Sequence, residues 1–288
     1  MSQILLTGTA TLDIVNTVER YPQEDDEVRA SASRVASGGN AANTAAVLAS
    51  LGHQSHLCAV LADDASAAHI RATLQHAEVD LRHCPQRSGA TPTSYITLGA
   101  ANGSRTIIHH RDLPELETED VSRIPLEEYD WLHFEGRNVF ATANQIRLAR
   151  RRLRDQPISV EIEKPRPGIQ RLFAYADVLL FSRSYALASG FSAADALLTA
   201  LRPQIPQAIL VCAWGEDGAW ALAPGDRRRF DCVHAPAYKA GPIVDTLGAG
   251  DTFNAGIIDA LCGGAMLEEA LAHANRLAGS KVAREGLL

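Results

Sequence analysis

Short apolar runs alternate with helical patterns along most of this chain of 288 residues. Runs of strand length separated by helix-length segments are typical of α/β proteins, in which successive strands lie parallel in one sheet. We therefore predict an α/β fold with a mainly parallel central sheet. Strands are expected at residues 4–15 (with a break at Gly8), 56–61, 79–82, 131–135, 158–162, 178–181 and 208–213, and 219–222 is expected to form a hairpin with the last of these. Helices are expected at 41–51, 65–76, 141–154, 251–261 and 267–282.

Two stretches depart from this alternation of strands and helices. Residues 16–34 are polar and alternating, and Tyr21-Pro22 breaks any helix there. Residues 91–98 and 104–110 alternate apolar and polar positions, and residues 101–103 between them suit a hairpin turn. Such two-faced strands differ from the buried runs elsewhere. We predict that they form a small sheet outside the main body, acting as a lid or as a contact between subunits.

Composition excludes several classes of function. The formal net charge of −7 argues against a general nucleic-acid binder or a membrane-surface protein. We find neither a long apolar run suited to a membrane span nor a signal-peptide pattern, so we expect a cytoplasmic protein. The five cysteines are odd in number and show no metal-ligand or redox spacing, which favours reduced thiols.

The stretch from Pro242 to Phe253 carries the strongest local signal for chemistry. Asp245 ends a short apolar run, the turn Gly248-Ala249-Gly250 follows, and a helical pattern opens at Asp251. Backbone N–H groups at a glycine turn before a helix form a ready anion site. Asp251 beside that site is either a proton acceptor in phosphoryl transfer or only an N-cap after a tight turn.

Polar residues also follow several predicted strands. In a mainly parallel sheet these ends share one edge, where ligands collect. Two glycines before Asn40 and Asn43 suit a pocket that grips hydroxyl groups, although a glycine turn with an Asn cap explains them equally well. The sequence lacks the P-loop motif Gly-x-x-x-x-Gly-Lys-[Ser/Thr], which argues against a P-loop enzyme. It also lacks Gly-x-Gly-x-x-Gly after the first predicted strand, which weakens a dinucleotide-binding interpretation. The strand-end clusters are Asp13, Glu135, Glu161 with Glu163, Ser182, Gly215–Gly218 and Gly248–Asp251.

Motifs spread from end to end resemble those of the ribokinase-like, PfkB-type carbohydrate kinases, and within that family the chain is most similar to the ketohexokinases. The resemblance implies a ribokinase-like three-layer α/β/α sandwich. It implies one domain over 1–288, with a β-sheet lid inserted from about 14–32 and 91–112. The motifs are residues 12–14, 21–25, 38–43, 103–107, 133–138, 160–166 and 211–214, and the family signature at 245–254.

The resemblance implies an ATP-dependent kinase acting on a ketohexose such as fructose at O1, with Mg²⁺ bridging the phosphates. Asp251 would be the general base, and Gly248, Ala249 and Gly250 the anion hole. The sugar would be bound by Asp13, Asp25, Gly39, Asn40, Asn43 and Asp251, with Asp25 reaching in across a homodimer formed through the lid. ATP would be bound by Arg105, Gly215, Glu216, Asp217, Gly218, Gly248 and Gly250, and a monovalent cation such as K⁺ would bind near Asp245 and Thr246.

One departure from the family pattern concerns the metal. The Asn-x-x-Glu motif that organises magnesium in many members is not evident, and Ser182-Arg183-Ser184-Tyr185 occupies its place. The magnesium-binding residues are therefore not predicted. Alternatives for the function are a same-fold kinase for ribose, a nucleoside or a sugar acid, and a non-catalytic sugar or nucleotide sensor.

Overall fold

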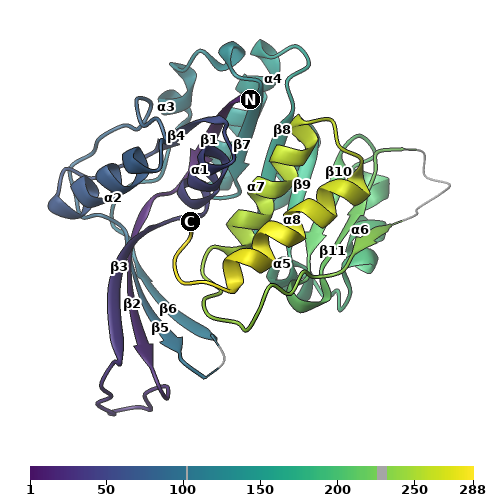
Figure 1. The fold of residues 1–288 in the computed structure, drawn as a ribbon. Helices are drawn as coiled ribbons and strands as arrows, with labels where there is room; N and C mark the ends of the chain where they lie inside the picture. Colours follow the sequence, from purple (N-terminus) through teal and green to yellow (C-terminus); the bar gives the residue numbers. More distant parts are fainter. Residues whose placement is uncertain (102, 226–231) are drawn as a thin grey trace.

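The structure is a computed structural model that describes residues 1–101, 103–225 and 232–288 (Figure 1). Within those residues the larger sheet has eight strands in the order β12-β11-β10-β9-β8-β7-β1-β4. Neighbours from β4 to β10 run parallel, and β11 and β12 are antiparallel additions at one edge. The predicted mainly parallel central sheet is confirmed. Its strands are β1 (Gln3–Gly8), β4 (Gln54–Ala59), β7 (Trp131–Glu135), β8 (Ile158–Ile162), β9 (Val178–Ser182), β10 (Ile209–Ala213), β11 (Ala219–Leu222) and β12 (Val233–Ala235).

Helices cover both faces of this sheet, because its strands are apolar on both sides. In β9, for example, Leu179 and Phe181 join one core cluster, whereas Val178 and Leu180 join the other. Figure 1 shows α1, α7 and α8 in front of the sheet. The three-layer α/β/α arrangement is thus present. The front layer contains α1 (Asn40–Ser50), α7 (Ala249–Cys262) and α8 (Leu267–Val282), and the back layer α3 (Thr118–Ser122), α4 (Val139–Arg152), α5 (Arg183–Ala188) and α6 (Ala194–Leu201).

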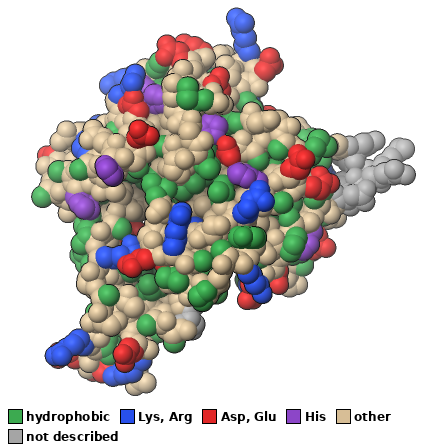
Figure 2. Space-filling view, viewed as in Figure 1, with side chains coloured by type: hydrophobic (Ala, Val, Ile, Leu, Met, Phe, Trp, Pro, Cys, Tyr) green, Lys and Arg blue, Asp and Glu red, His purple; other side chains and the backbone are tan. Residues whose placement is uncertain are grey.

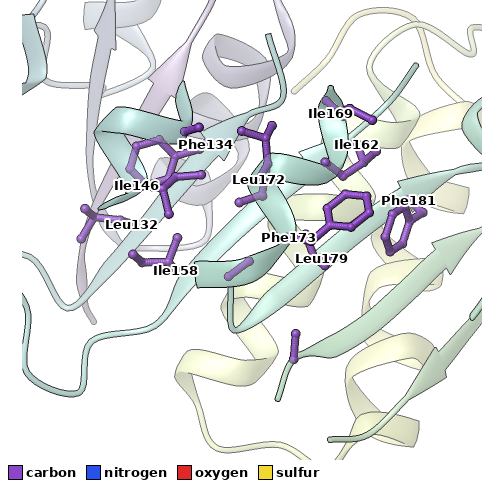
Figure 3. Close-up of a cluster of buried hydrophobic side chains, with 14 of the residues drawn as sticks. Leu132, Phe134, Ile146, Ile158, Ile162, Ile169, Leu172, Phe173, Leu179 and Phe181 are labelled. Atoms are coloured by element: carbon purple, nitrogen blue, oxygen red, sulfur yellow. The ribbon is translucent and has the colours of Figure 1, made fainter. Parts of the chain in front are cut away.

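The back layer contains a dense apolar core around Phe134. Figure 3 shows this side chain on β7 beside Ile146 of α4, with Leu172 and Phe173 over the neighbouring strands. The rings of Phe173 and Phe181 meet edge to face at 5.7 Å between centroids. This packing holds β7, β8 and β9 in register, so their carboxyl ends present residues to the same edge of the sheet.

The second sheet has four strands in the order β3-β2-β5-β6 and projects away from the main body (Figure 1). Its β5 and β6 form the hairpin predicted for the separate sheet, whereas β2 and β3 overlap the predicted stretch 16–34 only at their ends that face the connecting loop. Asn102 in the expected turn lies outside the described residues. The helix α2 (Ala65–His76), capped by Asp64 through a 2.8 Å bond from Ala67 N, packs against β2 and β3. The strands are β2 (Thr11–Val18), β3 (Ala32–Gly38), β5 (Thr93–Gly99) and β6 (Arg105–His110).

The prediction that residues 4–15 form one strand of the main sheet is wrong. Residues 3–8 pair with β4 and β7, whereas residues 11–18 pair with β3 and β5 of the small sheet. The chain changes sheets at Thr9, whose N–H donates to Glu135 Oε2 at 2.8 Å. Both segments are half-apolar, so only their partners distinguish them. Asp13 consequently lies on the small sheet, rather than at the end of a central strand.

Two smaller differences concern other segments. The expected strand at 79–82 is reduced to a single bridge between His56 and Asp80, because the segment turns away at Arg82. The short helices α3, α5 and α6 and the edge strand β12 were not foreseen, since each is too short for a clear periodic pattern. The helix predicted at 65–76 and the strands predicted at 131–135 and 158–162 are confirmed at those bounds.

Candidate functional site

A cavity of about 670 Å³ lies where the small sheet meets the carboxyl edge of the main sheet. Residues from both sheets and from the first turns of α1 and α7 line it, so segments far apart in the sequence converge there. The chain's last residues also line it, and Figure 1 shows the C-terminus close to α1 and the base of the small sheet. The lining includes Asp13, Arg34, Gly39, Asn40, Asn43, Ser94, Arg105, Glu161, Glu163, Asp245, Gly248, Gly250, Asp251 and Asn254.

One face of the small sheet supplies part of this lining. Asp13 of β2 pairs with Ser94 of β5, which pairs with His109 of β6, and all three side chains line the cavity. The hydroxyl of Thr11 donates to Asp13 Oδ1 at 2.9 Å. Burial raises the pKa of Asp13, although the hydrogen bonds from Thr11 and Ser94 oppose the shift. Such a half-buried carboxylate is suited to accept hydrogen bonds from ligand hydroxyl groups.

The first turn of α1 places two amides at the cavity. Gly39 precedes the helix with φ of 99°, a conformation that favours glycine, and a Cβ there would collide with the carbonyl of Thr9. Asn40 Nδ2 then donates to Glu161 Oε2 at 3.0 Å, and Asn43 Nδ2 to Asp251 Oδ2 at 2.7 Å. The spacing of three residues puts both amides on one face of the helix, as the sequence predicted.

The amino end of α7 lies beside the first turn of α1 and also lines the cavity. Gly248 has φ of 74°, and the helix begins at Ala249, so the N–H groups of its first turn have no partners within the helix. The positive end of the helix dipole lies at the same place. The arrangement is suited to hold an anion such as a phosphoryl group.

Asp251 lies in the first turn of α7 and is 7% exposed. Burial raises the pKa of its carboxyl to about 8, with Glu163 and Glu135 adding to the shift and Asn43 opposing it. Burial also raises the pKa of Glu161 well above its ordinary value, and Glu161 accepts hydrogen bonds from Asn40 and, at 3.0 Å, from Asn254. A carboxyl with a pKa near working pH is suited to accept a proton from a hydroxyl group.

This electrostatic environment predicts a pH dependence. If deprotonated Asp251 is the active form, kcat/KM rises with pH and levels off above about 8, the pKa of Asp251 in the free protein. The Glu163→Gln variant removes a negative charge that raises this pKa, so its profile should be displaced to lower pH. The measurement is the pH profile of kcat/KM for both proteins. The exposed Glu268→Gln serves as control, and an unchanged Glu163→Gln profile would contradict the assignment.

Not all the predicted site residues converge on the cavity. Arg105 lines it and donates to Thr246 Oγ1 at 2.8 Å. Ala249 begins α7, but its side chain is outside the lining. Gly215–Asp217 form a 3₁₀ turn between β10 and β11, followed by Gly218, and these four residues also lie outside the lining.

Asp25 lies apart from the cavity as well. It is exposed in the loop between β2 and β3, where its φ is 60°. Figure 2 shows acidic and basic side chains together at the far end of the small sheet, the region that contains this loop and the ion pair of Arg20 with Asp26. Within one chain, therefore, Asp25 is not brought to the other predicted sugar-binding residues.

Several cavity residues were not among the predicted site residues. Asn254 follows Asp251 by three positions, and this helical spacing is a signal that would have found it. Glu161 and Glu163 were noted only as strand-end acids. Arg34, which pairs with the cavity residue Asp245, gave no local signal because arginines on polar strands usually face solvent. The same holds for Lys281 on α8, which lies outside the cavity lining and is fully buried against Asp245.

In the described ranges, no group of three or more His, Cys, Asp or Glu side chains could hold a metal ion. The cavity lining does contain carboxylates, among them Glu163 and Asp251, and Mg²⁺ that keeps water ligands and binds nucleotide phosphates commonly needs only one or two of them. In the same ranges, no helix is both long and apolar enough to cross a membrane.

Comparison with known proteins agrees with this architecture. Mouse ketohexokinase is 37% identical over 293 residues, covering 99% of this chain and 97% of the relative. An ATP-dependent ribose-1-phosphate kinase from Halopiger xanaduensis is 27% identical, covering 99% and 94%.

Solved ribokinase structures share the fold. The ribokinase of Giardia lamblia superimposes with a TM-score of 0.84 at 18% identity, covering all of this chain and 96% of that one. Arabidopsis thaliana ribokinase, solved with ribose and ATP, gives a TM-score of 0.79 at 21% identity, covering 99% and 94%. The model of the pfkB family of carbohydrate kinases matches residues 1–288. With its ribokinase-like fold and this match over its whole length, the chain belongs to the pfkB family of carbohydrate kinases, enzymes that transfer a phosphoryl group to a sugar hydroxyl.

Proposed function

We propose that this protein is an ATP-dependent kinase that phosphorylates a ketohexose such as fructose at O1. The observation that carries the proposal is the position of Asp251: its buried carboxylate lies between the amide of Asn43 and the amino end of α7. An acceptor hydroxyl held by the α1 amides would thus have a base on one side and an anion site beyond it. The preference for a ketohexose rests on the similarity to mouse ketohexokinase.

In this mechanism the sugar is bound by Asp13, Gly39, Asn40 and Asn43, whose groups line the cavity. Asp251 accepts the proton of the attacking hydroxyl. The N–H groups at Gly248, Ala249 and Gly250 stabilise the negative charge on the moving phosphoryl group. Mg²⁺ that arrives with the nucleotide would neutralise charge on its phosphates.

The nucleotide would extend from the amino end of α7 toward the carboxyl end of β10. Arg105 lies at the cavity on the small sheet and would contact the phosphates, a role suited to a guanidinium group. Gly215, Glu216, Asp217 and Gly218 lie beyond the cavity lining, next to Ala213, which lines it. We place the rest of ATP along this turn.

The main alternative is the same chemistry on ribose, a nucleoside or a sugar acid. It is favoured by the relative that acts on ribose 1-phosphate and by the likeness to ribokinases. A few side chains of the small sheet and the cavity would decide between these acceptors, because one group more or less changes selectivity by about 10–200-fold. A sensor without activity would instead bind sugar and leave ATP intact.

A panel of sugars separates these possibilities. With ATP and Mg²⁺ held constant, we expect kcat/KM for fructose to exceed that for ribose by at least about tenfold. The position of the new phosphate, determined by NMR of the product, is expected to be O1. A preference for ribose, a nucleoside or a sugar acid would overturn the substrate assignment. If calorimetry shows sugar binding but no ADP is released, the assignment of the protein as a kinase would be overturned.

We further propose that the chain acts as one kinase domain whose small sheet is the lid. On the face of this sheet opposite to Asp13 and Ser94, Val35, Ile14, Tyr95 and Ile108 are consecutive partners in an apolar row across β3, β2, β5 and β6, and Val35 also lines the cavity. Val35, Tyr95 and Ile108 are 54%, 50% and 69% exposed. A second copy of the chain would cover this row. In such a dimer Asp25 would reach the cavity of the partner subunit, which would explain why it lies away from the cavity of its own chain.

The dimer is tested by changing Ile108. We expect sedimentation analysis to show a dimer for the wild type and a monomer for Ile108→Lys, because a charge would be buried in the apolar row. Phe140→Lys, at a position on α4 that is 73% exposed, should remain dimeric. A monomeric wild type, or an Ile108→Lys variant that stays dimeric, would contradict assembly through the lid.

A cytoplasmic location is part of the proposal. It is supported by Cys58 and Cys212, whose thiols are fully buried in the apolar core and form no disulfide. Reduced cysteines without disulfide partners are typical of proteins in reducing compartments.

A further inference from the structure

The carboxylate of Asp245 lies in the loop that leads into α7, and it is only 1% exposed. The resemblance to the family implies a monovalent cation near Asp245 and Thr246. A buried carboxylate needs a positive partner, because an unpaired charge in the protein interior costs on the order of several kcal/mol. The question is therefore which cation this chain provides.

Lys281, in the last turn of α8, provides one. Its side chain is 0% exposed, and its Nζ donates to the backbone carbonyl of Asp245 at 2.7 Å and lies 3.4 Å from Asp245 Oδ2. A lysine at a helix end ordinarily extends into water. The Lys281 side chain instead points into the protein. Burial lowers the pKa of Lys281, whereas the neighbouring Asp245 opposes this shift and favours the charged ammonium form.

The remaining oxygens of the expected cation site are engaged as well. Asp245 Oδ2 accepts from Arg34 at 2.7 Å, and Oδ1 accepts from Leu247 N at 2.9 Å. Thr246 Oγ1 accepts from Arg105 at 2.8 Å and donates to the carbonyl of Gly103 at 3.1 Å, while its own carbonyl accepts from Ala249 N at 3.4 Å. An additional K⁺ ion is disfavoured here, because Lys281 and Arg34 already balance the single negative charge of Asp245 and the oxygens that would bind the ion already accept hydrogen bonds.

We propose that the ammonium group of Lys281 takes the place of the monovalent cation, so that this kinase requires no K⁺. The proposal rests on the kinase activity of the family and not on which sugar is used. Lys281 acts as a positioning residue, because it balances the negative charge of Asp245. The Asp245 carboxylate in turn accepts hydrogen bonds from Leu247 N and, at 3.2 Å, from Gly286 N. These bonds orient the loop before α7 and the C-terminal residues. These groups hold the loop whose N–H donors face the cavity at the start of α7.

The first test uses the wild type at fixed ionic strength, in potassium or tetramethylammonium chloride. Activity is measured with the best sugar of the panel, and thermal unfolding is measured without substrates. We expect activity to change by less than about twofold and the unfolding temperature to be the same, because K⁺ has no site to occupy. Clear activation by K⁺, or stabilisation by K⁺ alone, would overturn the proposal. The unfolding measurement gives this answer even if no sugar is phosphorylated.

The second test creates a space for the ion. Lys281→Ala should lose at least about tenfold in kcat in tetramethylammonium, because Asp245 loses a buried partner. Potassium or ammonium ions should restore part of this activity and raise the unfolding temperature of the variant. Lys239→Ala, at an exposed position, should behave as the wild type in both salts. A Lys281→Ala protein that is fully active in tetramethylammonium would overturn the role of Lys281. If this variant does not fold, the wild-type comparison alone decides.

Discussion

Replacing Asp251 with asparagine is expected to lower kcat by about 10²–10⁴-fold, the usual loss when a general base is removed. The change is nearly isosteric, and the amide oxygen retains an acceptor for Asn43, which bonds Asp251 Oδ2 at 2.7 Å. The fold and sugar binding should therefore persist while proton transfer fails. The measurement is ADP release in a coupled assay, together with calorimetry of sugar binding.

Asp259 supplies the matched control for this experiment. It lies on the same helix but outside the cavity, where its carboxylate contacts His53 at 2.9 Å and His273 at 2.7 Å. Asp259→Asn should retain kcat, whatever it does to stability. Near-normal turnover by Asp251→Asn would rule out Asp251 as the base. An equal loss in both variants would mean that the effect comes from the helix rather than from the carboxylate.

The largest expected effect on stability follows from truncating Phe134. Its side chain is 0% exposed in the back-layer core (Figure 3), and Phe134→Ala should lower the free energy of unfolding by about 3–5 kcal/mol. The cost arises from lost apolar burial and from a cavity that the surrounding strands cannot fill. Urea or thermal unfolding, followed by circular dichroism, measures it.

Phe140 allows a like-for-like comparison, because it is 73% exposed at the start of the neighbouring helix α4. Phe140→Ala should change the free energy of unfolding by no more than about 0.5 kcal/mol. If the two variants unfold alike, the core around Phe134 is not packed as the structure shows.

The alternation of strands and helices was predictable because it depends on local periodicity. The runs at 131–135 and 158–162 are mostly apolar and of strand length, which is typical of strands buried on both faces, and Asp64 marks the start of α2 by capping it. The converging amides of Asn40 and Asn43 were predictable for the same reason, since residues three apart share a helix face. The family motifs then associated these positions with phosphoryl transfer, and the match over the whole chain confirmed the family.

Other features depend on contacts between distant residues. Residues 11–18 look like a continuation of the first strand, and only their pairing with β3 and β5 puts Asp13 on the small sheet. The pKa of Asp251 is raised by burial and by Glu163 and Glu135, and the sequence alone does not show that these acidic residues lie near Asp251. Asp25 carries no local sign that it lies away from the cavity of its own chain.

By itself the sequence determined the class of fold, the order of most of its longer elements and the turn that begins at Gly248, because each follows from spacings within a few residues. The tertiary structure decided which charges meet. Arg34 and Lys281 reach Asp245 across separations of 211 and 36 residues. No periodic pattern encodes such a meeting, since it depends on which faces of three separate elements become buried together.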